Sequence, residues 1–190
     1  MIYTIGHSNH PIERFISLLR QHGIQAVADV RSTPYSRFNP QFRRESLAAS
    51  LSDAGIRYVF LGQELGARSQ DPSCYDGNRV SYAKLARSAL FQSGLERLIS
   101  GMREFRIALM CAEREPLDCH RTILVTREVE HRGIPVTHVL PDGTLEPNSQ
   151  TMTRLVAEMK LGETDLFRDE ARLVEEAYDA RAQEVAYLKP

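Results

Sequence analysis

The sequence predicts an α/β protein with a doubly wound, mainly parallel sheet that has helices on both faces and a C-terminal helical extension. Short apolar runs alternate with stretches in which apolar residues recur at helical spacing. Most of the short runs are continuously apolar, which is typical of strands buried on both faces. Because crossovers between parallel strands are right-handed, this alternation favours a layered sandwich.

The first two predicted strands are each followed by a helix. Residues 2–8 form an apolar run that ends in Gly-His-Ser, and the helix after it has Pro11 in its first turn. Residues 26–30 form the second strand. The next segment, residues 32–40, is rich in Ser, Pro and Asn and is predicted to be a loop. A helix over residues 44–55 ends at a glycine.

A third strand over residues 56–61 leads into a long, turn-rich segment, residues 63–81. Loops of this length are commonly functional or mobile. Residues 82–105 have a helical pattern, in which Gly94 is the candidate break.

Residues 106–111 form the fourth predicted strand, and residues 136–140 form the fifth. Between them, Asp118 is well placed to be the N-cap of a helix that runs from Cys119 to Arg132. Gly133 would then end this helix.

Residues 1–145 are expected to form the α/β domain, and residues 146–190 a linker and a helix. The chain is polar after Pro147, and a helical pattern begins at about Thr164. The apolar stripe of this helix must be buried. It is expected to pack on its own domain or on a partner, so a monomer and a homodimer both stay open.

Composition predicts a cytoplasmic protein without a membrane partner. The chain is 42% hydrophobic and 26% charged, and its N-terminus lacks the pattern of a signal peptide. No run reaches the roughly 18 apolar residues that a membrane span needs. Three cysteines without an even framework indicate a reducing compartment. A net charge of −1 gives no general attraction to nucleic acid.

Four of the predicted strands lead into polar residues. In chain order these residues are His7 and Ser8, Asp29 and Arg31, Glu64 in the loop after the third strand, and Cys111 with Glu113. The carboxyl ends of parallel strands share one edge of a sheet, where doubly wound folds bind their ligands. These side chains are therefore expected to line one site.

A second group lies at the expected start of the helix after the fourth strand. With Asp118 as N-cap, the backbone N–H groups of Cys119, His120 and Arg121 would have no acceptor within the helix. The helix dipole and the guanidinium add positive charge, which suits an anion such as phosphate. The alternative is that Arg121 pairs with a nearby carboxylate and only ties loops together.

Five segments occur in a fixed order: TIGHSNHPIERFISLL, ADVRSTPYSRFNPQF, GIRYVFLGQELGAR, MCAEREPLDCHR and VTHVL. In this combination, over residues 2–141, the chain resembles the domain-of-unknown-function family 488, a set of small bacterial and archaeal proteins. The resemblance implies the α/β fold and a site at these motifs. It implies no reaction, because the family has no established activity.

The favoured function is that of a hydrolase or a glycosyl or group transferase acting on a phosphate-bearing, nucleotide or nucleic-acid-related substrate. Asp29 or Glu113 would be the base or nucleophile, and His7 the acid. Tyr35 and Arg37 lie in the loop after the second strand, where an aromatic ring and an arginine can hold a base and its phosphate. Alternatively, this loop is a lid, and its aromatic side chains serve only to pack it onto the domain.

Two other functions stay open. One is a non-catalytic protein that binds or senses nucleotides or nucleic acid through the same residues. The other is a rhodanese-like enzyme with Cys111 as nucleophile, since a thiolate near a helix N-terminus is reactive. The loop after Cys111 departs from that pattern, because it contains Pro116, lacks glycine, and reaches its arginine only ten positions later.

No cofactor is predicted, and a zinc or iron site is the least favoured alternative. Cys111, Cys119 and His120 supply suitable ligands, and His7 would complete a tetrahedron. The spacing is not that of a zinc finger. Adjacent residues on a helix also point about 100° apart, which makes chelation of one ion by Cys119 and His120 awkward.

Overall fold

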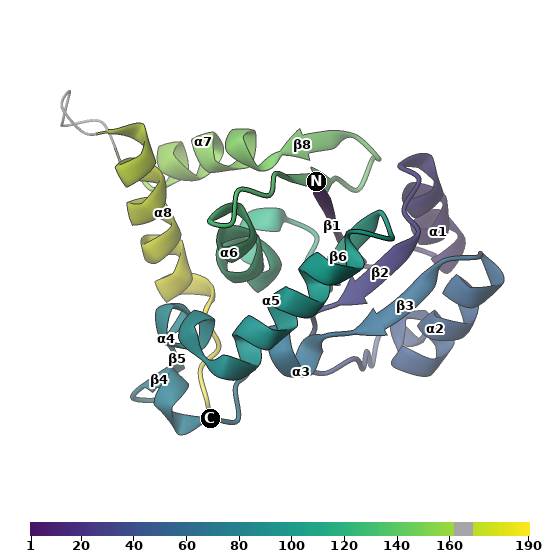
Figure 1. Cartoon of the computed structure of the whole chain (residues 1–190), viewed down its shortest axis with the longest axis horizontal. Helices are drawn as coiled ribbons and strands as arrows, with labels where there is room; N and C mark the ends of the chain where they lie inside the picture. The colour runs from purple at the N-terminus through teal and green to yellow at the C-terminus, as the bar shows by residue number, and fades with distance from the viewer. Residues whose placement is uncertain (162–168) are drawn as a thin grey trace.

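A six-stranded sheet with the order β3-β2-β6-β1-β7-β8 forms the middle of the computed structural model, which describes residues 1–161 and 169–190 (Figure 1). The strands of the sheet are β1 (Ile2–Gly6), β2 (Ala26–Asp29), β3 (Arg57–Phe60), β6 (Ile107–Cys111), β7 (Val136–Val139) and β8 (Leu145–Pro147). The first five of these are parallel, and β8 pairs antiparallel with β7. The mainly parallel sheet is therefore confirmed.

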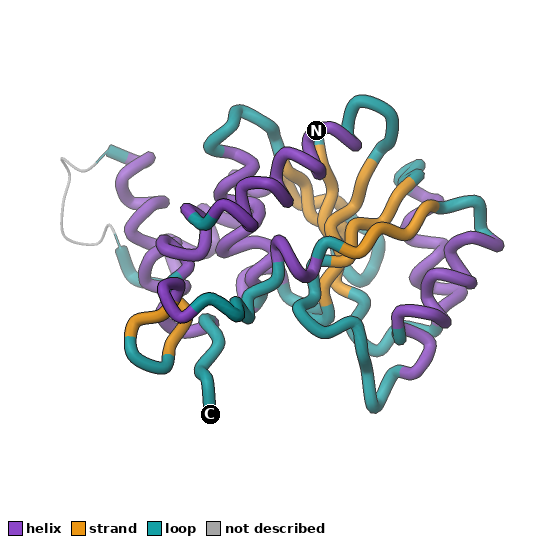
Figure 2. Tube along the Cα trace, turned by 60° about the horizontal axis from the view of Figure 1, so that its bottom comes forward, coloured by secondary structure: helices purple, strands orange, loops and turns teal. Residues whose placement is uncertain are grey.

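Helices cover both faces of this sheet, as predicted (Figure 2). One face packs against α1 (Ile12–Gln21) and α2 (Arg44–Asp53). The helices of the other layer and of the C-terminal segment are α3 (Gly62–Leu65), α4 (Tyr82–Arg87), α5 (Ala89–Gly101), α6 (Arg127–Glu130), α7 (Asn148–Glu158) and α8 (Glu170–Val185). Within β6, Leu109 and Cys111 point into the α5 side of the core, whereas Ala108 and Met110 point toward α1 and α2.

The long segment after β3 is not a structureless loop. It contains α3 and a two-stranded hairpin, β4 (Tyr75–Asp76) and β5 (Arg79–Val80). The helix predicted over residues 82–105 breaks at Ser88 and not at Gly94, because the Ser88 side chain accepts the N–H of Phe91 and caps α5. Gly94 allows α3 to approach closely, since a Cβ there would lie 2.5 Å from the Cβ of Glu64.

The helix after β6 also starts differently from the prediction. Asp118 ends a 3-10 turn and caps nothing, and Cys119 is the extended residue before the helix, with φ −132° and ψ 137°. The carbonyl of Cys119 accepts the N–H of Thr122 at 3.0 Å, and its sulfur accepts the N–H of Arg121 at 3.4 Å. The helix continues as a π-helical segment, Arg121–Thr126, and then as α6.

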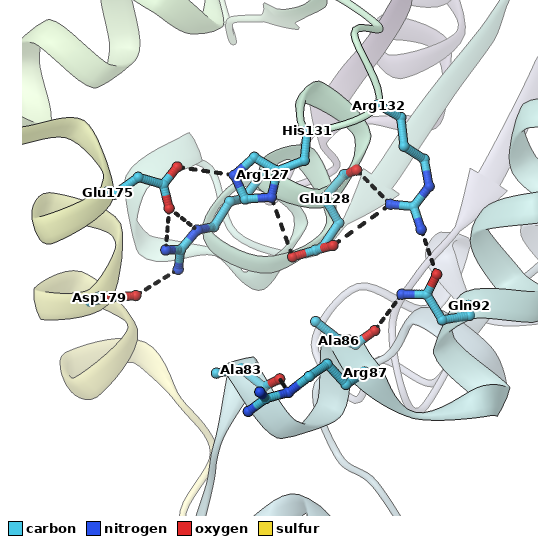
Figure 3. A network of polar contacts seen from close by, with 10 residues as sticks. All are labelled: Ala83, Ala86, Arg87, Gln92, Arg127, Glu128, His131, Arg132, Glu175 and Asp179. Atoms are coloured by element: carbon cyan, nitrogen blue, oxygen red, sulfur yellow. Dashed lines mark hydrogen bonds and ion pairs between the residues drawn. The ribbon is translucent and has the colours of Figure 1, made fainter. Parts of the chain in front are cut away.

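Residues 148–158 form helix α7, where the sequence predicts a polar linker. The predicted helix start near Thr164 lies outside the described residues. Side chains of α6 bind α8, where Arg127 donates to Glu175 and Asp179 (Figure 3). No helix among the described residues has both the length and the apolar character to cross a membrane.

A buried polar network joins the C-terminal helices to the sheet. His138 of β7 donates from Nε2 to Asn148 Oδ1 at 2.9 Å and accepts the Thr4 hydroxyl on Nδ1 at 2.8 Å. The amide of Asn148 donates to the Tyr178 hydroxyl at 2.9 Å and to Glu130 at 2.6 Å. Both imidazole nitrogens are engaged in the neutral form, so a proton on Nδ1 of His138 would reverse its bond with Thr4 and place a buried charge in this network.

Stability is expected to fall when the pH drops from 7 to about 5. Burial lowers the pKa of His138, and separately that of His7, from 6.5 to about 4. Below pH 6.5 the unfolded chain gains protons on these groups, whereas the native state gains them only near pH 4. The free energy of unfolding should therefore decrease by about 2 kcal/mol per histidine, measured by urea unfolding at the two pH values.

The matched variants for this measurement are His138→Gln and His22→Gln. His138→Gln should show a smaller loss between the two pH values, because one of the two responsible groups is gone. His22→Gln removes a half-buried histidine at the edge of the fold and controls for loss of an imidazole as such. An equal loss in the parent and in His138→Gln would contradict the prediction.

Candidate functional site

A polar pocket of about 650 Å³ lies at the carboxyl ends of β1, β2 and β6. Its lining includes seven of the residues that the sequence singled out, namely His7, Ser8, Arg31, Tyr35, Cys111, Glu113 and His120. Strand β6 lies between β1 and β2, and Gly6 pairs with Cys111 in the register. The loops after these three strands therefore meet at one edge of the sheet.

Asp29 lies behind the pocket wall and holds Arg31 in place. Its buried carboxylate accepts from Arg31 Nε at 2.9 Å, from Arg31 Nη2 at 2.7 Å and from the Tyr58 hydroxyl at 2.8 Å. Two of these donors belong to one guanidinium, which is the geometry of a bidentate ion pair. Asp29 is fully buried with both oxygens engaged, so its contacts favour positioning of Arg31 over the expected role as a base.

His7 connects Arg31 to the loop after β1. Its Nε2 accepts from Arg31 Nη1 at 3.2 Å, its Nδ1 donates to the carbonyl of Ser8 at 2.8 Å, and its ring stacks on Phe42. Burial, and then the charge of Arg31, lower the pKa of His7 to about 4. His7 is thus neutral at neutral pH, with both nitrogens engaged, which does not support the expected role as an acid.

Cys111, Cys119 and His120 form a buried cluster at the floor of the pocket. Nδ1 of His120 lies 3.7 Å from Cys111 Sγ and 3.9 Å from Cys119 Sγ. Nε2 of His120 is 2.9 Å from the carbonyl of Val30, so Nε2 carries the proton and Nδ1 faces the sulfurs. Glu113 places an oxygen 2.9 Å from Cys119 Sγ.

The two thiols of this cluster differ in their ionisation. Burial raises the pKa of Cys111, and the neighbouring Cys119 raises it further. Burial opposes ionisation of Cys119 too, but the hydrogen bond with Cys111 and the charge of Arg121 hold its pKa well below its usual range. A raised pKa at Cys111 does not favour the rhodanese-like nucleophile at that position.

Arg121 does not face the pocket. Its guanidinium is buried and donates to the carbonyls of Glu113 at 2.7 Å and Arg114 at 3.3 Å, and to the Thr4 hydroxyl at 3.4 Å. The backbone N–H groups of Cys119 and Arg121 are also occupied, by the carbonyl of Pro116 and by the Cys119 sulfur. Within the described part of the chain, Arg121 ties down the loop after β6 through backbone carbonyls and not through a carboxylate.

Arg37 and Glu64 are also outside the pocket. Arg37 is exposed and lies over the ring of Phe38. Glu64 forms an ion pair with Arg97 of α5 and packs against Gly94. The structure thus places Glu64 in the contact between α3 and α5.

Two more residues lie in the pocket wall: Arg68, which the sequence places in a segment that could close on the anion site, and Tyr187, which the sequence did not indicate. The guanidinium of Arg68 lies 4.6 Å from the ring centre of Tyr187, and its backbone N–H donates to Ser32 Oγ at 3.0 Å. Among the described residues, Arg68 forms no ion pair. No pattern in the sequence of the tail indicated that Tyr187 would reach the pocket.

The tail reaches the pocket through main-chain bonds to the hairpin after α3. The carbonyl of Tyr187 accepts the N–H of Val80 at 3.0 Å, and the N–H of Lys189 donates to the carbonyl of Asn78 at 2.7 Å. The end of the chain is therefore part of the pocket wall.

Comparison with known proteins gives one match. The family model described as "Domain of unknown function DUF488" matches residues 11–127, which is more than half of the 190 residues. No curated protein and no solved structure matches the chain.

Proposed function

The chain belongs to the DUF488 family, and on that premise we propose that it is an enzyme, a hydrolase or group transferase, whose substrate is an anionic, nucleotide-sized molecule bound at the strand ends. The observation that carries the proposal is that one pocket has arginines in one part of its wall and cysteine, glutamate and histidine side chains in another. Arg31 and Arg68 lie on the first, and Cys111, Glu113 and His120 on the second. The volume of about 650 Å³ suits a small-molecule ligand.

The anion-binding role rests mainly on Arg68. A pocket guanidinium without a carboxylate partner among the described residues is available for phosphate, which arginine binds through paired hydrogen bonds. Tyr187 holds Arg68 from one side, and Tyr35 offers an exposed ring at the pocket mouth. A pocket that holds both an exposed aromatic ring and a free arginine among the described residues suits a base and its phosphate.

In this proposal the other residues of the site divide into two groups. Arg31 contacts the substrate, while Asp29 and His7 keep its guanidinium in place through the bonds described above. Glu113 is the carboxylate that reaches the pocket, next to the cysteine–histidine cluster. Hydrolysis or group transfer fits this set, because a carboxylate and a cysteine–histidine cluster lie beside an anion site.

Arg68→Ala is expected to weaken binding of phosphate-bearing ligands by about tenfold or more, since a charge-assisted hydrogen bond contributes roughly 1.5–3 kcal/mol. The measurement is a thermal-shift titration with inorganic phosphate, nucleosides, nucleoside mono- and diphosphates and short single-stranded oligonucleotides. A ligand at 100 times its dissociation constant stabilises the parent by about 2.7 kcal/mol. Arg103→Ala, an exposed arginine outside the pocket, is the matched control.

Two results would contradict the anion site: no phosphate-bearing ligand stabilises the parent, or Arg103→Ala weakens binding as much as Arg68→Ala. If a ligand binds, its turnover is then followed by NMR in the parent and in Glu113→Gln. A ligand that both proteins bind equally and neither converts would identify a non-catalytic nucleotide-binding protein instead.

A further inference from the structure

Cys111, Cys119 and His120 present three metal-ligating atoms toward one another. Sγ of Cys111, Sγ of Cys119 and one imidazole nitrogen all lie within 4.8 Å of one another, and all three residues are buried. Two thiolates and an imidazole are ligands that zinc prefers. The three ligands come from two segments, the end of β6 and the start of the next helix, which the sheet edge brings together.

The spacing of these atoms is close to that of a zinc site. Zinc bonds of about 2.3 Å to sulfur and about 2.0 Å to nitrogen place sulfur and nitrogen roughly 3.5 Å apart in a tetrahedron. The observed separations from His120 Nδ1 are 3.7 Å to Cys111 Sγ and 3.9 Å to Cys119 Sγ. Shifts of a few tenths of an ångström would bring each sulfur to this spacing from the imidazole nitrogen, and the two sulfurs lie within 4.8 Å of each other.

The local backbone explains why two adjacent residues can chelate one ion here. Cys119 is extended and lies before the first helical turn, so its side chain is not bound by the angle between neighbouring helical residues. The hydrogen bond from His120 Nε2 to the carbonyl of Val30 fixes the ring with Nδ1 toward the sulfurs. Such a second hydrogen bond is the usual support for a metal-binding histidine.

We propose that Cys111, Cys119 and His120 bind one zinc ion, with a fourth coordination position open to the pocket. Cys111 and His120 both line the pocket, so an ion and its fourth ligand have access from that side. Three protein ligands and one open position are the pattern of catalytic zinc, which polarises a bound oxygen or lowers the pKa of a bound water. This goes beyond the proposed function, since zinc would bind whether or not a nucleotide does.

The test is the zinc content of the full chain, purified and kept reduced, incubated with zinc and freed of excess by gel filtration. The parent should retain about one zinc per chain. Cobalt in place of zinc should give a thiolate-to-metal charge-transfer band and the visible absorption of a tetrahedral site. Cys119→Ser and His120→Gln should each weaken zinc binding by at least about 100-fold, since loss of a supporting hydrogen bond alone costs 10–100-fold.

Two further variants complete the test. Cys74→Ser replaces a buried cysteine outside the cluster and should keep the zinc of the parent. Glu113→Gln should also keep it, and loss of zinc there would overturn the open fourth position. A reduced parent without zinc, or ligand variants that bind as the parent does, would overturn the site. If Cys119→Ser fails to fold, the cobalt spectrum of the parent and the zinc affinity of His120→Gln still decide whether the site exists. The experiment contains no nucleotide, so its failure is distinguishable from failure of the proposed anion site.

Discussion

The Asp29→Asn variant is expected to lose about 3–5 kcal/mol of the free energy of unfolding, because removal of one partner leaves a buried charge unpaired. Asp29 is fully buried, and Arg31 is 5% exposed. An asparagine keeps one oxygen and turns an amide toward the donors of Arg31 and Tyr58. The same change releases the Arg31 guanidinium in the pocket, so ligand affinity should fall with stability.

Urea unfolding at pH 7 measures this loss, with Asp53→Asn on α2 as the exposed control. The Asp29→Asn, Arg31→Gln double variant should be more stable than Asp29→Asn alone, because the unpaired charge is then gone. A double variant that is less stable than either single variant would show that the charge pair is not the source of the effect.

Gly6→Ala is expected to destabilise the protein by about 3 kcal/mol and to displace the loop after β6. A Cβ on Gly6 would lie 1.9 Å from the carbonyl oxygen of Glu113 and 2.9 Å from its carbonyl carbon. These are backbone atoms, so the loop must move as a whole. The same carbonyl accepts the bond from Arg121 Nη1, which would be lost with it.

The control for this variant is Gly101→Ala at the end of α5, where a Cβ would meet only the Cδ1 of Ile107, at 3.2 Å. That change should alter the free energy of unfolding by less than about 1 kcal/mol. Thermal melting and zinc content would be measured for both variants. If Gly6→Ala keeps the melting temperature and zinc content of the parent, the close approach of Gly6 to the Glu113 carbonyl does not hold the loop in place.

The sequence by itself determined the alternation of strands and helices and the place of the pocket. Apolar runs such as residues 107–111 are readable because strands buried on both faces consist mostly of apolar residues. The convergence of His7, Arg31 and Cys111 followed from the rule that parallel strands share one carboxyl edge. Helix α7 escaped prediction because it is polar over much of its surface, with burial concentrated at positions such as Met152 and Leu155.

Only the tertiary structure decided which residues face the pocket and which lie behind it. Asp118 is the favoured N-cap by residue type, but it ends a 3-10 turn, and Cys119 is the extended residue before the helix. The extended backbone of Cys119 places its sulfur near His120 and Cys111. Helical spacing alone predicts that Cys119 and His120 point about 100° apart. Arg121 donates to carbonyls of the loop after β6, and main-chain hydrogen bonds to the hairpin β4–β5 place Tyr187 in the pocket wall. These outcomes depend on contacts between segments distant in the chain, which local patterns of residues do not encode.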